Sequence, residues 1–220
     1  MIKIYITTIK NMLSTELWEE YIHLLTPAQK EVNGRYKLWK DRYAHLFGKL
    51  LIRNALIDKG YPKNVLNQLK QTKYGRPFIN NDIDFNISHS GEYVVCAINT
   101  KGRVGIDIQE KTEYPIIDDF KDFFCKNELE DINSSNNRQN TFFQLWARKE
   151  SIAKAEGRGM FLKLNQIEVL NYKVEIEDNI WFIKNLGFGE NYVGAITTNL
   201  PNISICFSLL NFYEKNSSAG

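Results

Sequence analysis

Three short runs of strand-like sequence follow one another in the middle of the chain, and they constrain the fold more than any other feature. Residues 84–88, 93–99 and 104–109 are rich in apolar and β-branched side chains. Residues 90–92 and 100–103 separate these runs and have the composition of turns. We therefore expect three consecutive strands at the centre of the fold.

Helices and further strands are predicted on both sides of this centre. Period-two alternation at residues 2–7 predicts a strand. Capping sequences at Ser14 and at residues 26–29 predict the starts of two helices. The other patterns predict helices at 40–59, 116–131 and 141–156, a polar loop at 133–140, and strands at 167–170, 181–184, 192–198 and 203–208.

The order of strand, helices and strands occurs once in each half of the chain. This order predicts an α+β fold with two loosely similar halves joined near residues 100–103. We place the halves at residues 1–102 and 103–220.

The composition excludes several other classes of protein. Of 220 residues, 43% are hydrophobic and 25% are charged, which is typical of globular proteins and excludes disordered or collagen-like chains. The longest unbroken apolar stretch, residues 93–98, is far shorter than the ~20 residues that cross a bilayer. The first ten residues do not resemble a signal peptide, and three scattered cysteines predict no disulfide framework. We expect a soluble, cytoplasmic protein without an export signal.

Charge is distributed unevenly along the chain. Residues 1–100 carry 14 Lys or Arg against 9 Asp or Glu, whereas residues 101–220 carry 14 against 17. This asymmetry suits a cleft that binds a phosphorylated small molecule beside a cation. Nucleic acid is a poorer fit, because the basic residues form no dense stripe.

Two polar side chains interrupt the third strand-like run. Asp107 stands among Val104, Ile106 and Ile108, where a carboxylate is costly unless a cation or hydrogen bonds meet it. Gln109 follows two positions later, so both side chains project from the same face. Taken alone, this pattern is also typical of an edge strand whose polar face meets water.

A second candidate group lies on the helix predicted at residues 141–156. Trp146, Glu150 and Lys154 recur every four residues, so they share one helical face. The ordinary alternative is an exposed Glu–Lys pair of little energetic consequence.

Ser88 and His89 form a third candidate group at the end of a predicted strand. No nucleophile-elbow sequence surrounds Ser88, and neighbouring strand residues point to opposite faces, so a hydrolase triad is disfavoured. Hydroxyl, imidazole and backbone N–H groups at a strand end can instead bind phosphate. A satisfied structural histidine is the ordinary alternative.

Taken together, these groups resemble the signature of the surfactin-activating (Sfp) type of 4′-phosphopantetheinyl transferase. The resemblance spans residues 41 to 159 in family order, and the chain length also matches. The matching segments are Asn86-Ile87-Ser88-His89-Ser90, Gly105-Ile106-Asp107, Tyr74-Gly75-Arg76-Pro77, Leu51-Ile52-Arg53, and Trp146 with Lys149, Glu150, Ser151, Lys154, Gly157 and Gly159.

The resemblance implies both a fold and a reaction. The fold is two pseudo-symmetric α+β halves in one chain, with the active site in the cleft between them. The reaction transfers the 4′-phosphopantetheine arm of coenzyme A to a serine of an acyl or peptidyl carrier protein and releases adenosine 3′,5′-bisphosphate. Such phosphoryl transfer needs mainly positioning and a hard cation such as Mg²⁺.

Family roles can be carried over to matching positions only. Asp107 and Glu150 match metal ligands, and Glu150 also matches a base for the serine hydroxyl. Gln109 stands where many relatives carry a third acid. The positions implied to bind coenzyme A are Arg42, His45, Tyr74, Gly75, Arg76, Pro77, Ser88, His89 and Lys154. Of these, Lys154 matches a catalytic lysine that contacts the pyrophosphate, and His89 matches a position near the ribose 3′-phosphate.

The first half departs from the family pattern. Relatives often carry two basic residues at alternate positions before the helix glycine, whereas here Arg42 is followed by Ala44, with His45 next and Gly48 closing the match. The residue that binds the 3′-phosphate is therefore open, as are the identity of the carrier protein and the choice between Mg²⁺ and Mn²⁺.

Two alternative functions and two further expectations accompany this hypothesis. A non-catalytic module that binds coenzyme A or a carrier protein, and a phosphohydrolase acting on coenzyme A, remain as alternatives. We expect a monomer that binds neither nucleic acid nor membranes. Residues 114–117 and Phe120 are expected to border the carrier protein, although helix core is an equally good interpretation of Ile117 and Phe120.

Overall fold

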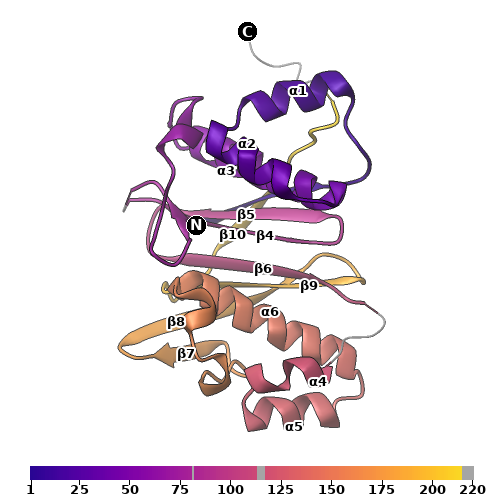
Figure 1. Ribbon diagram of the computed structural model, residues 1–220. Coiled ribbons are helices and arrows are strands. Elements are labelled where there is room, and N and C mark those ends of the chain that lie inside the picture. Colours follow the sequence, from indigo (N-terminus) through magenta and orange to yellow (C-terminus); the bar gives the residue numbers. More distant parts are fainter. Residues whose placement is uncertain (81, 113–116, 215–220) are drawn as a thin grey trace.

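The computed structural model describes residues 1–80, 82–112 and 117–214 and arranges them in four layers (Figure 1). Helices of the first half cover one four-stranded sheet, a second four-stranded sheet lies beneath the first, and helices of the second half cover its far side. This confirms the predicted α+β fold with two similar halves.

The first half contains the elements that the sequence predicts, with two very short strands in addition. Ser14 accepts a hydrogen bond from the amide of Leu17, and Thr26 and Gln29 form a reciprocal capping box, so both predicted helix starts are confirmed. The elements are β1 (Ile2–Thr8), α1 (Thr15–His23), α2 (Pro27–Arg35), α3 (Trp39–Ile57), η1 (Val65–Gln68), β2 (Lys70–Gln71), β3 (Pro77–Phe78), β4 (Asp84–Ser90) and β5 (Tyr93–Asn99).

The described part of the second half again contains one 19-residue helix, together with five strands, of which four form its own sheet. Its elements are β6 (Val104–Glu110), α4 (Ile117–Phe120), η2 (Lys121–Phe123), α5 (Lys126–Ser134), α6 (Arg138–Glu156), η3 (Gly159–Phe161), η4 (Leu164–Gln166), β7 (Lys173–Ile176), β8 (Asn179–Gly187), β9 (Tyr192–Thr198) and β10 (Ile205–Leu209). Within the described ranges, no helix is both long and apolar enough to cross a membrane.

In the second half one predicted strand is wrong and two predicted helices have other bounds. The described part of the helix predicted at 116–131 is divided into α4, η2 and α5. Helix α6 begins at Arg138, one turn before the predicted start at Thr141, because Asn137 caps it by accepting from the amide of Asn140. Residues 167–170 form no strand. Their backbone groups bond to buried charged side chains instead, as when Val169 donates to Glu128 and accepts from Arg148.

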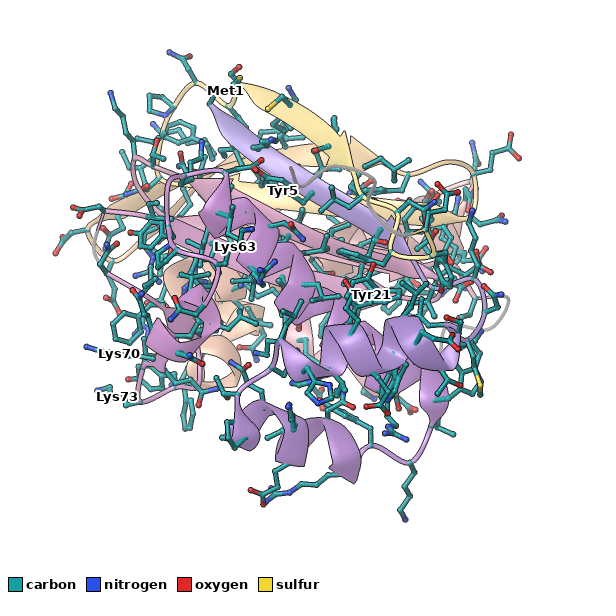
Figure 2. The ribbon with its side chains drawn as sticks, turned by 90° about the horizontal axis from the view of Figure 1, so that it is seen from above. Met1, Tyr5, Tyr21, Lys63, Lys70 and Lys73 are labelled. Carbon is teal, nitrogen blue, oxygen red and sulfur yellow. The ribbon has the colours of Figure 1, made fainter. Side chains whose placement is uncertain are left out.

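The two sheets are built mainly from antiparallel pairs. The first has the order β10-β1-β5-β4 and the second has the order β6-β9-β8-β7. Only the β1–β10 pair is parallel among the paired strands of these sheets in the described residues. Figure 2 looks onto the helices of the first half and labels Tyr21 of α1 and Tyr5 of β1, which both belong to the apolar core of this half.

The last strand of the chain, β10, does not join the sheet of the second half. Although it comes last in the chain, β10 pairs with β1, so it completes the sheet of the first half. Phe212 also packs in the core of the first half. In the division that we predict, residues 103–220 therefore supply one strand to the sheet of the first half.

Three apolar clusters fill the spaces between the layers. One lies between the helices and sheet of the first half, one lies between the helices and sheet of the second half, and the third joins the two sheets. The third contains Ile2, Ile4, Val95, Ala97, Val104, Ile106, Ile108, Leu186 and Ile196. The halves are thus held together by a shared core.

A row of polar contacts joins the sheets along one edge, where β4 lies beside β6 (Figure 1). Four side chains of β4 accept hydrogen bonds from four backbone amides of β6. We call these side chains the β4 ladder: Asp84 accepts from Val104 (2.7 Å), Asn86 from Ile106 (3.0 Å), Ser88 from Ile108 (3.4 Å) and Ser90 from Glu110 (2.9 Å).

Candidate active site

Asp107 lies at the centre of β6 and is almost completely buried, with 2% of its surface exposed. Its carboxylate accepts hydrogen bonds from the Ser88 hydroxyl (2.9 Å), the Gln109 amide (2.7 Å) and the Lys154 ammonium (2.6 Å). The sequence prediction that Asp107 and Gln109 share a face agrees with this contact. The buried carboxylate is therefore paired and hydrogen-bonded, as its burial requires.

Helix α6 brings Glu150 and Lys154 to this carboxylate. The helix packs against β6 and β9, and its closest approach to β6 is at Gly105. A Cβ atom at Gly105 would overlap the carbonyl oxygen of Ser151 and the amide nitrogen of Ala155. The glycine therefore allows the helix to lie directly on the strand that carries Asp107.

Glu150 is half-buried and close enough to Asp107 and Lys154 to respond to their charges. Burial raises the pKa of the Glu150 carboxyl, Lys154 counteracts this increase, and Asp107 adds to it. Two carboxylates that disfavour each other's charge are a suitable place for a cation.

Ser88 connects the strand end to the same cluster. Its hydroxyl donates to Asp107 and accepts from Lys154 (3.0 Å) and from the amide of Ile108. A hydroxyl has one proton, so in this arrangement the Ser88 proton is committed to Asp107.

His89 points away from this cluster but remains within electrostatic range of it. Its side chain keeps a solvent-exposed face. The surrounding protein lowers the pKa of the imidazole by removing water from the charged form, and Lys154 lowers it further, whereas Asp41 and Asp107 raise it. Neutral His89 can donate to or accept from a ligand through either ring nitrogen.

A cavity of about 540 Å³ lies between α2, α3 and the strand region of residues 69–71. His45 and Lys49 line it from α3, and Lys70 lies at its rim and projects outward in Figure 2. Burial, Lys49 and His89 together lower the pKa of His45 to about 4. Burial also lowers the pKa of the Lys49 ammonium. Both groups would gain from an anionic ligand.

The turn at residues 74–77 lines a second, smaller cavity of about 190 Å³. Lys154 and Gly157 complete its wall from the second half, so this cavity lies between the two halves as the sequence analysis expects for the active site. The turn itself is tight, because Gly75 adopts a positive φ of 82°.

The structure assigns Arg76 and Arg42 to contacts within the protein. The Arg76 guanidinium donates to Asp84 (2.7 Å) and to the backbone carbonyls of Val104 and Lys154. Arg42 lies over the ring of Trp18, with its Cζ atom 5.1 Å from the ring centroid. The Arg76 guanidinium is therefore held by protein acceptors, whereas the buried Nε atom of Arg42 has no hydrogen-bond partner among the described residues.

Two further residues of the helix motif, Lys149 and Trp146, contact other parts of the second half. Lys149 is fully buried, 2.7 Å from the Glu128 carboxylate, and it donates to the carbonyls of Leu164 and Ile167. Trp146 packs on Phe120 at 4.9 Å between ring centroids. The sequence analysis named Lys149 only as part of the matching motif and gave it no role in the site.

The region expected to border a carrier protein is only partly described. Residues 114–116 lie outside the described residues. Ile117 and Phe120 both pack against the core of the second half, so the helix-core interpretation holds for these two residues.

Lys49 is the clearest functional candidate that the sequence analysis missed. It follows Gly48 directly and lies one helical turn after His45. The four-residue spacing on one helix face was the available signal.

Comparison with known proteins identifies the family. The profile of the 4′-phosphopantetheinyl transferase superfamily matches residues 103–196, and that of the N-terminal region of 4′-phosphopantetheinyl transferases matches residues 12–101. The transferase gsp of Aneurinibacillus migulanus is 36% identical, over 75% of this chain and 70% of its own. The transferase Sfp of Bacillus subtilis is 30% identical, over 96% of this chain and 99% of its own.

The chain therefore belongs to the 4′-phosphopantetheinyl transferase superfamily. Because the similarity to Sfp extends nearly from end to end, it is a transferase of the surfactin-activating type. It is an enzyme that moves the phosphopantetheine moiety of coenzyme A to a carrier protein, as the resemblance implied.

Proposed function

We propose that transfer occurs at the seam between the halves, with Asp107, Glu150 and Lys154 as the catalytic residues. The observation that carries this proposal is the contact between Lys154 of α6 and buried Asp107 of β6 (2.6 Å), with Glu150 one turn away on the same helix. Serine of an acyl or peptidyl carrier protein is the proposed acceptor, and adenosine 3′,5′-bisphosphate is the proposed leaving product.

The donor set fits a hard divalent cation such as Mg²⁺. Mg²⁺ is typically held by one or two carboxylates together with water and substrate phosphate. Asp107 and Glu150 supply the carboxylates, and the amide of Gln109 lies beside Asp107. Among the described residues, no cluster of three or more His, Cys, Asp or Glu side chains forms a fuller site. Mg²⁺ bound here would stabilise negative charge on the phosphate oxygens.

The phosphates of coenzyme A are proposed to lie along a row of basic groups. Lys154 is suited to the pyrophosphate because it lies beside the carboxylate pair, and His89 because it is within electrostatic range of Lys154 and Asp107. His45 and Lys49, in the larger cavity, are suited to the 3′-phosphate. This assigns the 3′-phosphate to α3 and leaves Arg42 and Arg76 in the structural contacts described above.

The backbone of the turn at residues 74–77 is proposed to contact the adenine side of the cofactor. Tyr74, Gly75 and Pro77 line the smaller cavity together with Lys154. The Arg76 side chain is directed inward, so only its backbone is available at this position.

Glu150 is proposed to accept the proton of the attacking serine, directly or through a water molecule. The serine oxygen would form a bond to the phosphorus attached to pantetheine while the bond to the leaving adenosine phosphate breaks. The raised pKa of Glu150 brings a carboxylate closer to the basicity that proton acceptance at neutral pH needs. Lys154 would hold the departing phosphate oxygens.

Mass analysis of an apo carrier protein tests this function. The carrier is incubated with coenzyme A, Mg²⁺ and the enzyme, and its intact mass is measured. A serine-linked phosphopantetheine adduct is expected. An unchanged carrier with intact coenzyme A would favour a binding module, and an unchanged carrier with cleaved coenzyme A would favour a phosphohydrolase.

A monomer and a cytoplasmic location are also proposed. The candidate site takes residues from both halves of one chain, so a second copy is not needed to complete it. Cys96, Cys125 and Cys206 are free thiols, which suits a reducing compartment. Sedimentation that shows an obligate oligomer would contradict the monomer.

A further inference from the structure

The β4 ladder joins two sheet edges in an unusual way. Strand β6 is at the edge of its sheet, and an edge strand leaves alternate backbone amides without partners. Here those amides donate to side chains of β4 at a constant offset of 20 residues along the chain. Side chains therefore set the register between the two halves at this edge.

The register matters because the ladder runs past the candidate active site. Ser88, its third member, donates to Asp107 and accepts from Lys154. A slip of two residues would move Asp107 by roughly 7 Å relative to Ser88. Such a slip would also separate Asp107 from the end of β4 that carries His89.

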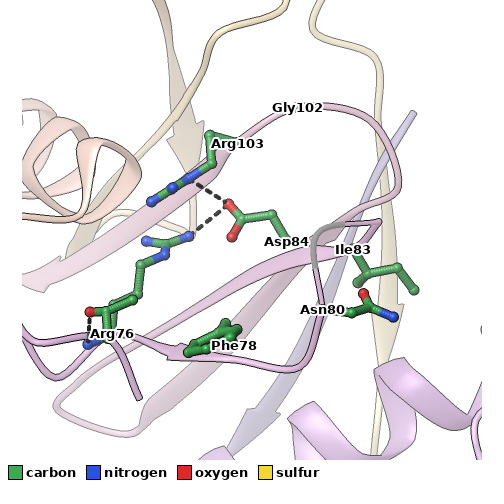
Figure 3. A pocket seen from close by; sticks show the side chains of 8 residues that line it. Arg76, Phe78, Asn80, Ile83, Asp84, Gly102 and Arg103 are labelled. Atoms are coloured by element: carbon green, nitrogen blue, oxygen red, sulfur yellow. Dashed lines mark hydrogen bonds and ion pairs between the residues drawn. The ribbon is translucent and has the colours of Figure 1, made fainter. Parts of the chain in front are cut away.

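The first member of the ladder, Asp84, also connects β4 to helix α6 through Arg76. Asp84 accepts from Arg76, and Arg103 lies 3.5 Å from the same carboxylate oxygen (Figure 3). Arg76 also donates to the backbone carbonyls of Val104 and Lys154. One side chain thus holds both the start of β6 and the helical turn that carries Lys154.

Asn86 is the ladder member between the anchor Asp84 and Ser88, and it also lines the smaller cavity beside the turn at residues 74–77. It is buried, with 7% of its surface exposed, and its Oδ1 atom accepts from the amide of Ile106, immediately before Asp107. We propose that the β4 ladder, anchored by Arg76 at Asp84, positions Asp107 against Lys154, and that Asn86 is a positioning residue for transfer. This inference rests on the proposed function of those two residues.

Two variants that differ by a single hydroxyl test this role. Asn86→Ser keeps a hydrogen-bond acceptor of the kind already used at Ser88 and Ser90, whereas Asn86→Ala removes it. In Asn86→Ala we expect faster hydrogen exchange of the Ile106 amide, a kcat that is roughly 10- to 100-fold lower because the reacting groups are displaced, and a higher Mg²⁺ requirement. Asn86→Ser should stay close to the wild type in all three measurements.

Asn99→Ala is the matched control for loss of stability. Asn99 is also buried, but within the described part of the chain its side chain bonds only to the backbone of Lys101 in the next turn. All variants are assayed at a temperature at which circular dichroism shows them folded. Asn99→Ala should lower the melting temperature while keeping kcat and the Mg²⁺ requirement.

Three results would overturn the inference. They are normal kcat in Asn86→Ala, equal loss in Asn86→Ser and Asn86→Ala, or unchanged exchange of the Ile106 amide in Asn86→Ala. Failure of the proposed function is a different result, because the wild-type enzyme would then show no transfer while the exchange measurements still report on the ladder.

Discussion

Gln109 determines the charge of the proposed metal site. With Asp107 and Glu150 as its carboxylates, the site nearly balances a divalent cation, and Gln109 adds a neutral amide that donates to Asp107. We expect Asp107→Ala and Glu150→Ala to abolish transfer. Gln109→Ala should cost far less, because a water molecule can replace the amide.

The substitution Gln109→Glu should lower the Mg²⁺ concentration that gives half-maximal transfer, because a third negative charge attracts the cation more strongly. The same change should lower the melting temperature in EDTA, since two carboxylates would then meet without a cation. Mg²⁺ titrations of activity and thermal unfolding check both effects. Loss of activity in Gln109→Ala equal to that in Asp107→Ala would make Gln109 an essential ligand.

We expect His45 to take up a proton when the cofactor binds. Its pKa is lowered to about 4 in the free protein, so the imidazole is neutral at pH 7. A bound phosphate would favour the charged form and raise this pKa, so binding of coenzyme A should take up a proton. Calorimetry in buffers of different ionisation enthalpy measures this uptake. His45→Gln should remove it, with titration of the cofactor's own phosphate left as the background.

The same shift predicts how stability depends on pH. A histidine with a lowered pKa binds its proton more readily in the unfolded chain, so its contribution to stability is lost as pH falls from about 6.5 towards 4. Above that range the imidazole is neutral in both the folded and the unfolded chain, so His45 should not make stability depend on pH. Urea unfolding of the wild type and His45→Gln at several pH values checks the sign, since the variant should lose less stability on acidification.

Residue patterns predicted part of the site and left part of it open. Period-two spacing placed Asp107 and Gln109 together, and helical spacing placed Glu150 with Lys154. The contact between Lys154 and Asp107 depends on how closely α6 lies on β6, which no local pattern encodes. The inward direction of Arg76 likewise depends on partners 8 to 78 positions away.

At the scale of elements, Gly105 controls the distance between α6 and β6. Gly105→Ala should destabilise the protein by about 1–3 kcal/mol or more and lower activity, because the new methyl group overlaps backbone that cannot move aside. Gly187→Ala, in β8, is the matched control, since a Cβ atom there meets nothing within 4 Å. Urea unfolding and the transfer assay measure both variants, and equal behaviour would contradict the packing argument.

The buried pair Lys149–Glu128 ties α6 to α5. Both side chains are fully buried and 2.7 Å apart, so Lys149→Met should cost about 3–5 kcal/mol by leaving Glu128 without its counter-ion. Adding Glu128→Gln should restore part of this loss. Lys126→Met, which breaks the exposed pair with Glu130, should cost no more than about 1 kcal/mol. Denaturant unfolding compares them, and no recovery in the double variant would count against the pair.

Helices and strands were predictable where their hydrogen-bond partners lie nearby in the sequence. The helices capped by Ser14 and Thr26 and the strands β4, β5 and β6 follow from nearby residues. Residues 167–170 have the apolar character of a strand. Their backbone groups, however, form hydrogen bonds with the buried side chains of Glu128, Arg148 and Lys149 instead of with another strand. The pairing of β10 with β1 could not be predicted from nearby residues either, because β1 lies about 200 positions earlier in the chain.

At the scale of the whole molecule, the two halves should unfold together. An apolar core between the sheets and the β4 ladder join the two halves. In addition, strand β10 follows the second half in the chain but completes the sheet of the first half. Calorimetry of the full chain should therefore show one transition with equal calorimetric and van't Hoff enthalpies. A fragment of residues 1–102 lacks β10 and leaves the inter-sheet face of Ile2, Ile4, Val95 and Ala97 uncovered, so it should show no cooperative unfolding. Two separate transitions, or a fragment that unfolds cooperatively by itself, would show that the halves are independent domains.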